Sequence, residues 1–160
     1  MRVCALGSGS SGNCFFISEN NHAILIDAGF SCKETLRRLN LVNQNPLDIK
    51  AIFITHEHTD HIKGADVLAR HLNIPIYATK KTIANSFLCK NPELINIIKY
   101  DETIKINNLH IEAFSKSHKA SDPVSYSVLS EKRVSIITDL GHACQNTIDK
   151  ISKSDLLFIE

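Results

Sequence analysis

Alternating runs of apolar and polar residues divide the start of the chain into short segments. Apolar runs cover residues 1–6, 14–18 and 22–27, and they are separated by a glycine-rich stretch and a polar turn at residues 19–21. Short runs bounded by turn residues are typical of β-strands. Because the connections are also short, we expect these three strands to pair as an antiparallel meander.

Beyond residue 30 the pattern alternates between helix and strand. Ser31 and Glu34 match a capping box, which predicts a helix that ends near Asn40. The apolar, β-branched run over residues 51–55 predicts a buried strand. Apolar residues at helical spacing then predict a second helix over residues 62–71.

The second half of the chain is expected to be rich in strands. A short strand at 74–78 and a helix over 80–90 come first, and two hairpins follow. The later expected elements are strands at 103–106, 109–115, 126–130 and 134–139, a helix at 146–152 and a last strand at 155–159. Strands and helices alternate without strict βαβ regularity, so we expect one α/β domain (an α+β mixed sheet) over residues 1–160.

Composition limits the class of protein. A chain of 160 residues with 43% hydrophobic content can bury a core, and its formal net charge of +1 argues neither for nor against a polyanionic partner. No apolar run approaches the ~18 residues of a membrane span, and the N-terminal run is too short for a secretory signal. We therefore expect a cytoplasmic protein with no membrane partner. Five cysteines without a CxxC pair argue against a disulfide framework.

The stretch THEHTDH, at residues 55–61, concentrates titratable side chains after a predicted strand. His56 and His58 are two residues apart, so they point the same way in extended backbone. Asp60 and His61 follow in the turn, and imidazole and carboxylate groups are ligands of Zn²⁺, Fe²⁺ and Mn²⁺. Four such side chains exceed what one tetrahedral site draws from so short a loop, which favours two metals. The alternative is a polar surface loop whose histidines cap the next helix.

The segment HEHTDH resembles the HxHxDH signature of the metallo-β-lactamase-fold hydrolases. Three further motifs follow that family's order, with Asp27 in LIDAG, His118 in SKSHKASDP and Asp139 in ITDLG. The opening ALGSGSSGN is similar to the YycJ/WalJ-like branch, some members of which are 5′→3′ DNA exonucleases. The resemblance implies an αββα architecture, represented here by its N-terminal part. Members usually continue further, and that continuation carries a fifth motif with one more histidine ligand.

The resemblance also implies a role for each motif residue. His56, His58 and His118 would hold one metal and leave a position open, as in catalytic zinc sites. Asp60 and His61 would bind a second metal, and Asp60 is the residue that we also count as catalytic.

Two aspartates complete the site that the resemblance implies. Asp139 would bridge the two metals, and Asp27 would orient a ligand histidine through its other ring nitrogen. A water between the cations would be hydroxide near neutral pH and would attack phosphorus or a carbonyl carbon. The cofactors expected are two divalent ions, zinc first, with Mn²⁺ or Fe²⁺ as alternatives.

Two surface features each have two interpretations. In GSGSSGN, the polar side chains of Ser8, Ser10 and Asn13 could contact a phosphate, or the segment is a flexible hairpin loop. The basic clusters could contact a nucleic-acid backbone or could be solvated helix faces; they comprise Lys33, Arg37 and Arg38, and Lys80 and Lys81. His142 lies near Asp139, but the motif pattern assigns it no role.

The expected substrate is a phosphodiester in DNA or RNA, which rests on the branch resemblance and not on charge. A small ester, thioester or lactone is the alternative substrate. A third hypothesis is an inactive, truncated metal-binding interaction module. A homo-oligomeric partner or a missing C-terminal segment would supply the last ligand.

Overall fold

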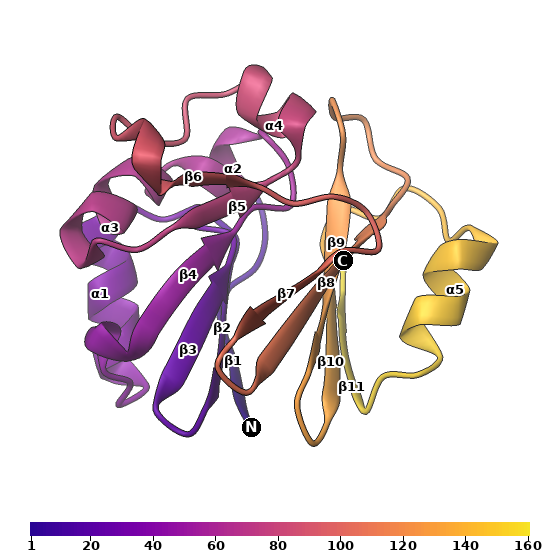
Figure 1. Ribbon diagram of the computed structural model, residues 1–160, viewed down its shortest axis with the longest axis horizontal. Helices are drawn as coiled ribbons and strands as arrows, with labels where there is room; N and C mark the ends of the chain where they lie inside the picture. Colours follow the sequence, from indigo (N-terminus) through magenta and orange to yellow (C-terminus); the bar gives the residue numbers. More distant parts are fainter.

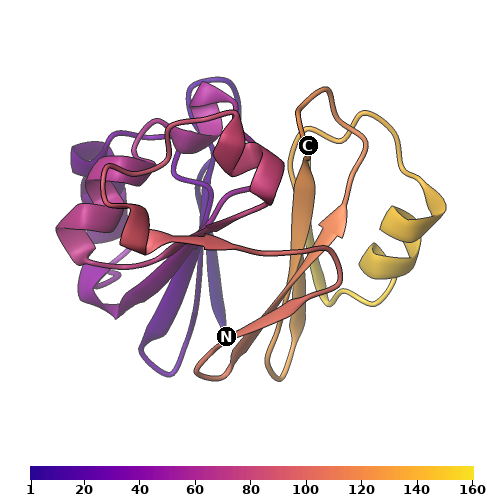
Figure 2. The same cartoon turned by 45° about the horizontal axis from the view of Figure 1, so that its top comes forward.

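Two β-sheets face each other at the centre of the computed structural model, which describes residues 1–160 (Figure 1). Helices α1 (Cys32–Leu41) and α3 (Ala65–Leu72) cover the outer face of the first sheet. Helix α5 (Gln145–Ile151) covers the outer face of the second sheet and is yellow in Figure 2. The layers are therefore helix, sheet, sheet and helix, which confirms the predicted αββα arrangement and the mixed α and β class.

The first sheet has the strand order β1-β2-β3-β4-β5-β6. Strands β1 to β3 form the predicted antiparallel meander, and β3 to β6 run parallel to one another. The parallel strands end at the same edge of the sheet, so the loops that follow them lie close together. The bounds are β1 Arg2–Gly7, β2 Cys14–Glu19, β3 His22–Ile26, β4 Ile49–Phe53, β5 Ile76–Ala78 and β6 Ile95–Ile97.

The second sheet has the order β11-β10-β9-β8-β7 and contains both predicted hairpins. Its last strand, β11, pairs in parallel with β10, because α5 carries the chain back across the sheet. The bounds are β7 Thr103–Ile106, β8 Leu109–Ser115, β9 Val124–Leu129, β10 Arg133–Ile137 and β11 Leu156–Ile159.

Strand alternation builds two hydrophobic cores on the two faces of the first sheet. Phe16 and Leu25 belong to the core under the helices. Phe15 and Ile24 belong to the core between the two sheets, where they join Tyr126 of the second sheet. The first sheet is thus buried on both faces, and its loops carry the polar chemistry.

The helix predicted over residues 62–71 is interrupted. It consists of α2 (Thr59–Ile62) and α3, with Lys63 and Gly64 between them. The Gly64 backbone N–H donates to Ala28 O at 2.8 Å, and a Cβ on Gly64 would lie 1.9 Å from Phe30 O. The break lets the chain pack directly against the loop that follows β3.

The helix predicted over residues 80–90 was too long. Helix α4 covers only Lys80–Ala84. The chain then turns and buries Leu88 and Cys89 in the core under the helices, and this tertiary packing ends the helix early. Two 3₁₀ turns, Pro46–Asp48 and Pro92–Leu94, precede β4 and β6.

Candidate metal centre

The predicted ligands converge at the edge where the parallel strands of the first sheet end. The histidine-rich loop leaves β4, and Asp27 directly follows β3. The segments after β8 and β10 in the second sheet bring in His118 and Asp139. Side chains from both sheets therefore meet at one place.

Three histidines form the first ligand group. His56 Nε2 lies 3.0 Å from His58 Nδ1, and His118 Nε2 lies 3.3 Å from the same atom. One ligand atom from each residue lies within 4.8 Å of the other two. His58 and His118 are 60 residues apart in the chain, so this cluster is a product of the fold.

A second group contains His56, His61 and Asp139. Asp139 Oδ2 lies 3.0 Å from His61 Nε2 and 3.8 Å from His56 Nε2. Asp60 joins from α2, which also carries His61, with Oδ2 at 3.4 Å from His61 Nε2. His56 is common to both groups, and its side chain is fully buried.

The chemistry of these groups fits a divalent cation. The Oδ2 atom of Asp139 is buried and has no hydrogen-bond partner, which is costly unless a cation lies nearby. Burial, with His61 and Lys116 as positive neighbours, lowers the pKa of His56 far below its usual range. Burial also lowers the pKa of His118. Neutral imidazoles keep the lone pairs that a metal requires.

Asp27 lies behind the cluster and contacts His61. Its Oδ2 accepts from His61 Nδ1 at 2.7 Å and from Thr55 Oγ1 at 2.8 Å, and its Oδ1 accepts from Thr55 N at 2.8 Å. Burial opposes protonation of His61, but Asp27, Asp139 and Asp60 outweigh it and raise its pKa. With Nδ1 donating to Asp27, the Nε2 atom faces the candidate centre.

The two aspartates share an unusual backbone conformation. Asp27 has φ 62° and Asp139 has φ 52°, in the left-handed region that residues other than glycine rarely occupy. Asp27 is the first residue after β3, and Asp139 is the second residue after β10. This conformation turns their carboxylates toward the histidines.

The side chain of Asn13 lies beside the candidate metal centre, whereas the sequence placed it only in a glycine-rich loop. Its side chain is buried, with Nδ2 at 3.1 Å from His61 Nε2 and 3.3 Å from Asp60 Oδ2. The sequence signal was an asparagine between a glycine-rich loop and a buried strand. Ser8, in contrast, donates to Glu160 Oε2 at 2.6 Å, and both Ser8 and Ser10 are exposed.

Lys116 is a residue that sequence reasoning missed. Burial lowers its pKa to about 8, although the carboxylates of Asp27, Asp139 and Glu160 act in the opposite direction. Its Nζ donates to the backbone O of Thr138 and lies 3.3 Å from Thr138 Oγ1. Lys116 thus connects the loop that carries His118 to the strand end that carries Asp139. A lysine two residues before the motif histidine was the only sequence signal.

Other predicted contacts lie outside the cluster. His142 Nδ1 is 2.8 Å from Ser117 Oγ, and neither metal-type group includes it. Arg37 and Arg38 both pair with Glu34 on α1, so these two charges have an intramolecular partner.

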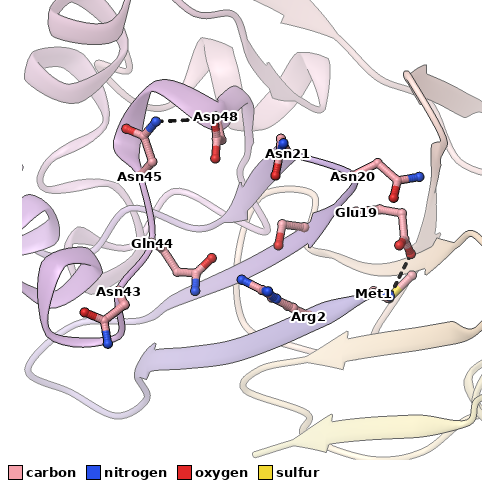
Figure 3. A pocket seen from close by; sticks show the side chains of 10 residues that line it. Met1, Arg2, Glu19, Asn20, Asn21, Asn43, Gln44, Asn45 and Asp48 are labelled. Carbon is pink, nitrogen blue, oxygen red and sulfur yellow. Dashed lines mark hydrogen bonds and ion pairs between the residues drawn. The ribbon is translucent and has the colours of Figure 1, made fainter.

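A polar cavity of about 470 Å³ lies away from this centre (Figure 3). It is bordered by the chain start, the turn between β2 and β3, and the loop after α1. No histidine lines it, and Asp48 places it at the opposite end of β4 from His56. Its chemistry is therefore separate from the candidate metal centre.

None of the helices is both long enough and apolar enough to cross a bilayer.

Known proteins are similar to this chain in sequence and in fold. Residues 7–90 match the metallo-β-lactamase superfamily. The chain is 36% identical to exodeoxyribonuclease WalJ of Streptococcus pneumoniae, over 97% of this chain and 60% of that protein. It is also 36% identical to exodeoxyribonuclease YycJ of Bacillus anthracis, over 89% of this chain and 55% of that protein. The chain thus spans less than two thirds of the length of these relatives.

Solved structures agree on the fold. A metallo-β-lactamase of Cronobacter sakazakii has a TM-score of 0.76 at 14% identity, covering 98% of this chain and 76% of that one. A subclass B3 metallo-β-lactamase from a soil metagenome has a TM-score of 0.73 at 16% identity, covering 99% and 79%. The WalJ and YycJ relatives support the branch that the glycine-rich opening predicted. This chain belongs to the metallo-β-lactamase superfamily.

Proposed function

We propose that this chain carries the metal centre of a metal-dependent phosphodiesterase that acts on nucleic acid, as a 5′→3′ DNA exonuclease. The observation that carries the proposal is the meeting of two metal-type ligand groups on the shared residue His56. Two relatives at 36% identity are named exodeoxyribonucleases, which supports DNA as the substrate class.

The residues divide between two metal ions. His56, His58 and His118 would hold the first ion. Asp60 and His61 would hold the second, with Asp139 shared between the two. Sites with nitrogen and oxygen donors bind zinc more tightly than Mn²⁺ or Fe²⁺, so we propose zinc first. When bound, the ions would supply Lewis acidity and a water of lowered pKa.

The other residues position this ligand set. Asp27 and Thr55 hold the His61 ring so that Nε2 faces the centre. Lys116 holds the backbone next to Asp139, and the burial of His56 excludes bulk water from one side. These contacts keep the donors in place before a metal or substrate arrives, which lowers the cost of ordering them.

The second metal has fewer protein ligands than the first. Only Asp60, His61 and a share of Asp139 are available within residues 1–160. We therefore propose that a further histidine completes this site, from a segment outside these 160 residues or from a partner chain. These residues would then be the N-terminal part of a metallo-β-lactamase-like domain.

The test combines metal analysis with activity on one sample. Zinc-loaded protein, alone and in a longer form of the chain, is incubated with 5′-labelled single- and double-stranded DNA and with a chromogenic ester. We expect release of nucleotides from the 5′ end, no ester cleavage, and loss of activity with a chelator. Ester cleavage without DNA cleavage by the longer form would contradict the proposal.

A further inference from the structure

The amide of Asn13 is directed into the candidate metal centre from the loop between β1 and β2. Its Oδ1 accepts from Gly9 N at 2.9 Å, which leaves Nδ2 on the side of His61 and Asp60. The Asn13 backbone is held as well, since its N–H donates to Asp60 O at 2.8 Å and its O accepts from Gly29 N at 2.9 Å. The side chain therefore has little freedom to turn away.

The two N–H bonds of this amide have different surroundings. One can donate to Gly9 O, at 3.3 Å from Nδ2. The other faces His61 Nε2 at 3.1 Å and Asp60 Oδ2 at 3.3 Å. In the tautomer whose Nδ1 proton is directed to Asp27, the lone pair on His61 Nε2 faces the Asn13 amide.

Metal binding would remove this acceptor. The lone pair of His61 Nε2 is the one that a metal would take, and Asp60 would turn its carboxylate to the same ion. Asn13 is only 1% exposed, so a new acceptor has to be an atom that lies within the centre itself. A buried donor without an acceptor is unfavourable, and an oxygen of a substrate held at the metals would satisfy it.

We propose, on the basis of the function proposed above, that Asn13 is a substrate-binding residue whose Nδ2 donates a hydrogen bond to a phosphate oxygen of the nucleic acid. An anionic oxygen is the best acceptor, because hydrogen bonds to charged groups are stronger than neutral ones. The contact lies on the side of His61 and Asp60, so it orients the phosphate relative to the second ligand group.

Two substitutions at Asn13 test this contact. Asn13→Leu removes both polar ends at similar volume. Asn13→Asp keeps the acceptor for Gly9 N–H and replaces the donor with an anionic oxygen, so it also serves if Asn13→Leu does not fold. Asn40→Leu is the matched control, because Asn40 is an exposed residue of α1.

Thymidine 5′-monophosphate is the probe, since it carries the phosphate but has no phosphodiester to cleave. Its Kd is measured by calorimetry in zinc-containing buffer, and zinc affinity is measured separately by competition with a chromophoric chelator. We expect both Asn13 variants to weaken nucleotide binding by about tenfold or more while zinc binding is retained. Asn40→Leu should match the wild type in both measurements.

Three results would overturn the inference, and each has a different consequence for the proposed function. Wild-type nucleotide affinity in both Asn13 variants would exclude the contact but leave the phosphodiesterase proposal intact. Loss of zinc from Asn13→Leu would make Asn13 a metal ligand. A longer form of the chain that binds zinc but not the nucleotide would remove the phosphate site itself, and the proposed function with it.

Discussion

Asp27 and His61 form a fully buried pair, with 2.7 Å between Asp27 Oδ2 and His61 Nδ1. The contact decides which ring nitrogen of His61 faces the candidate metal centre, because the proton on Nδ1 is shared with the carboxylate. A residue that follows β3 thereby controls a ligand that lies in α2, which follows β4 in the chain.

Asp27→Asn should weaken metal binding on the order of 10- to 100-fold. The amide keeps the shape of the carboxylate but loses the charge that favours a proton on His61 Nδ1. Zinc affinity is measured by competition with a chromophoric chelator, with Asp149→Asn on exposed α5 as the control. Equal zinc affinity in wild type and Asp27→Asn would show that His61 is oriented without this charge.

His58→Ala and Asp60→Ala should each lower DNA cleavage by at least ~10²-fold in a form of the chain that is active. Each removes a proposed ligand, so both the metal and its water are disturbed. Initial rates on 5′-labelled DNA provide the measurement. His71→Ala, in the exposed part of α3, should retain full activity. Near-normal turnover in either ligand variant would rule out the proposed ligand assignment.

The isolated 160-residue chain should retain close to one metal after dialysis. Its first ligand group has three imidazoles, whereas the second shares His56 with the first and should release its ion more readily. Mass spectrometry of the dialysed protein, with size-exclusion chromatography of the same sample, measures this stoichiometry. His118→Ala should retain less metal than the wild type. Two ions held tightly by a monomer would mean that the second site is already complete.

Gly29→Ala should destabilise the fold by ~1–3 kcal/mol or more, because it forces atoms into a packed region. A Cβ at Gly29 would lie 1.7 Å from Asp60 O and 2.6 Å from Asn13 N. Urea unfolding measures the loss. Gly141→Ala is the control, since its Cβ would meet no atom closer than 3.1 Å and should change stability much less. An equal effect at both glycines would contradict close packing at Gly29.

Glu34 should contribute to stability at neutral pH and lose that contribution in acid. Hydrogen bonds from Arg37 and Arg38 lower its pKa from the ordinary value of 4.5 to about 2. The folded state therefore binds the proton less readily than the unfolded state, and the contribution is lost as pH falls from 4.5 to about 2. Urea midpoints of wild type and Glu34→Gln should differ at pH 6 and converge near pH 2. A constant difference across this range would exclude the linkage.

Local patterns predicted the strands other than β6, because these strands are short, apolar and bounded by turn residues; β6 has only three residues, Ile95–Ile97, and was not predicted. The histidine loop was also visible, since its ligand-type side chains are adjacent in sequence. Their meeting with His118 and Asp139 was expected from motif order, and the distances to His58 and His61 agree with it.

Features that depend on tertiary contact were less visible. The break at Gly64 arises from a carbonyl of the loop after β3, and helical periodicity contains no information about that neighbour. The burial of Lys116 depends on Thr138 across the second sheet. The direction of the Asn13 amide depends on Gly9 and on His61, which is 48 residues away.

The candidate centre takes donors from both sheets, so its assembly has an order during synthesis. The histidine loop leaves the ribosome well before His118 and Asp139, and a nascent chain holds only part of each ligand group. Closing the 60-residue separation between His58 and His118 costs chain entropy that only the packed sheets repay. Both ligand groups are therefore complete only once the second sheet has docked on the first.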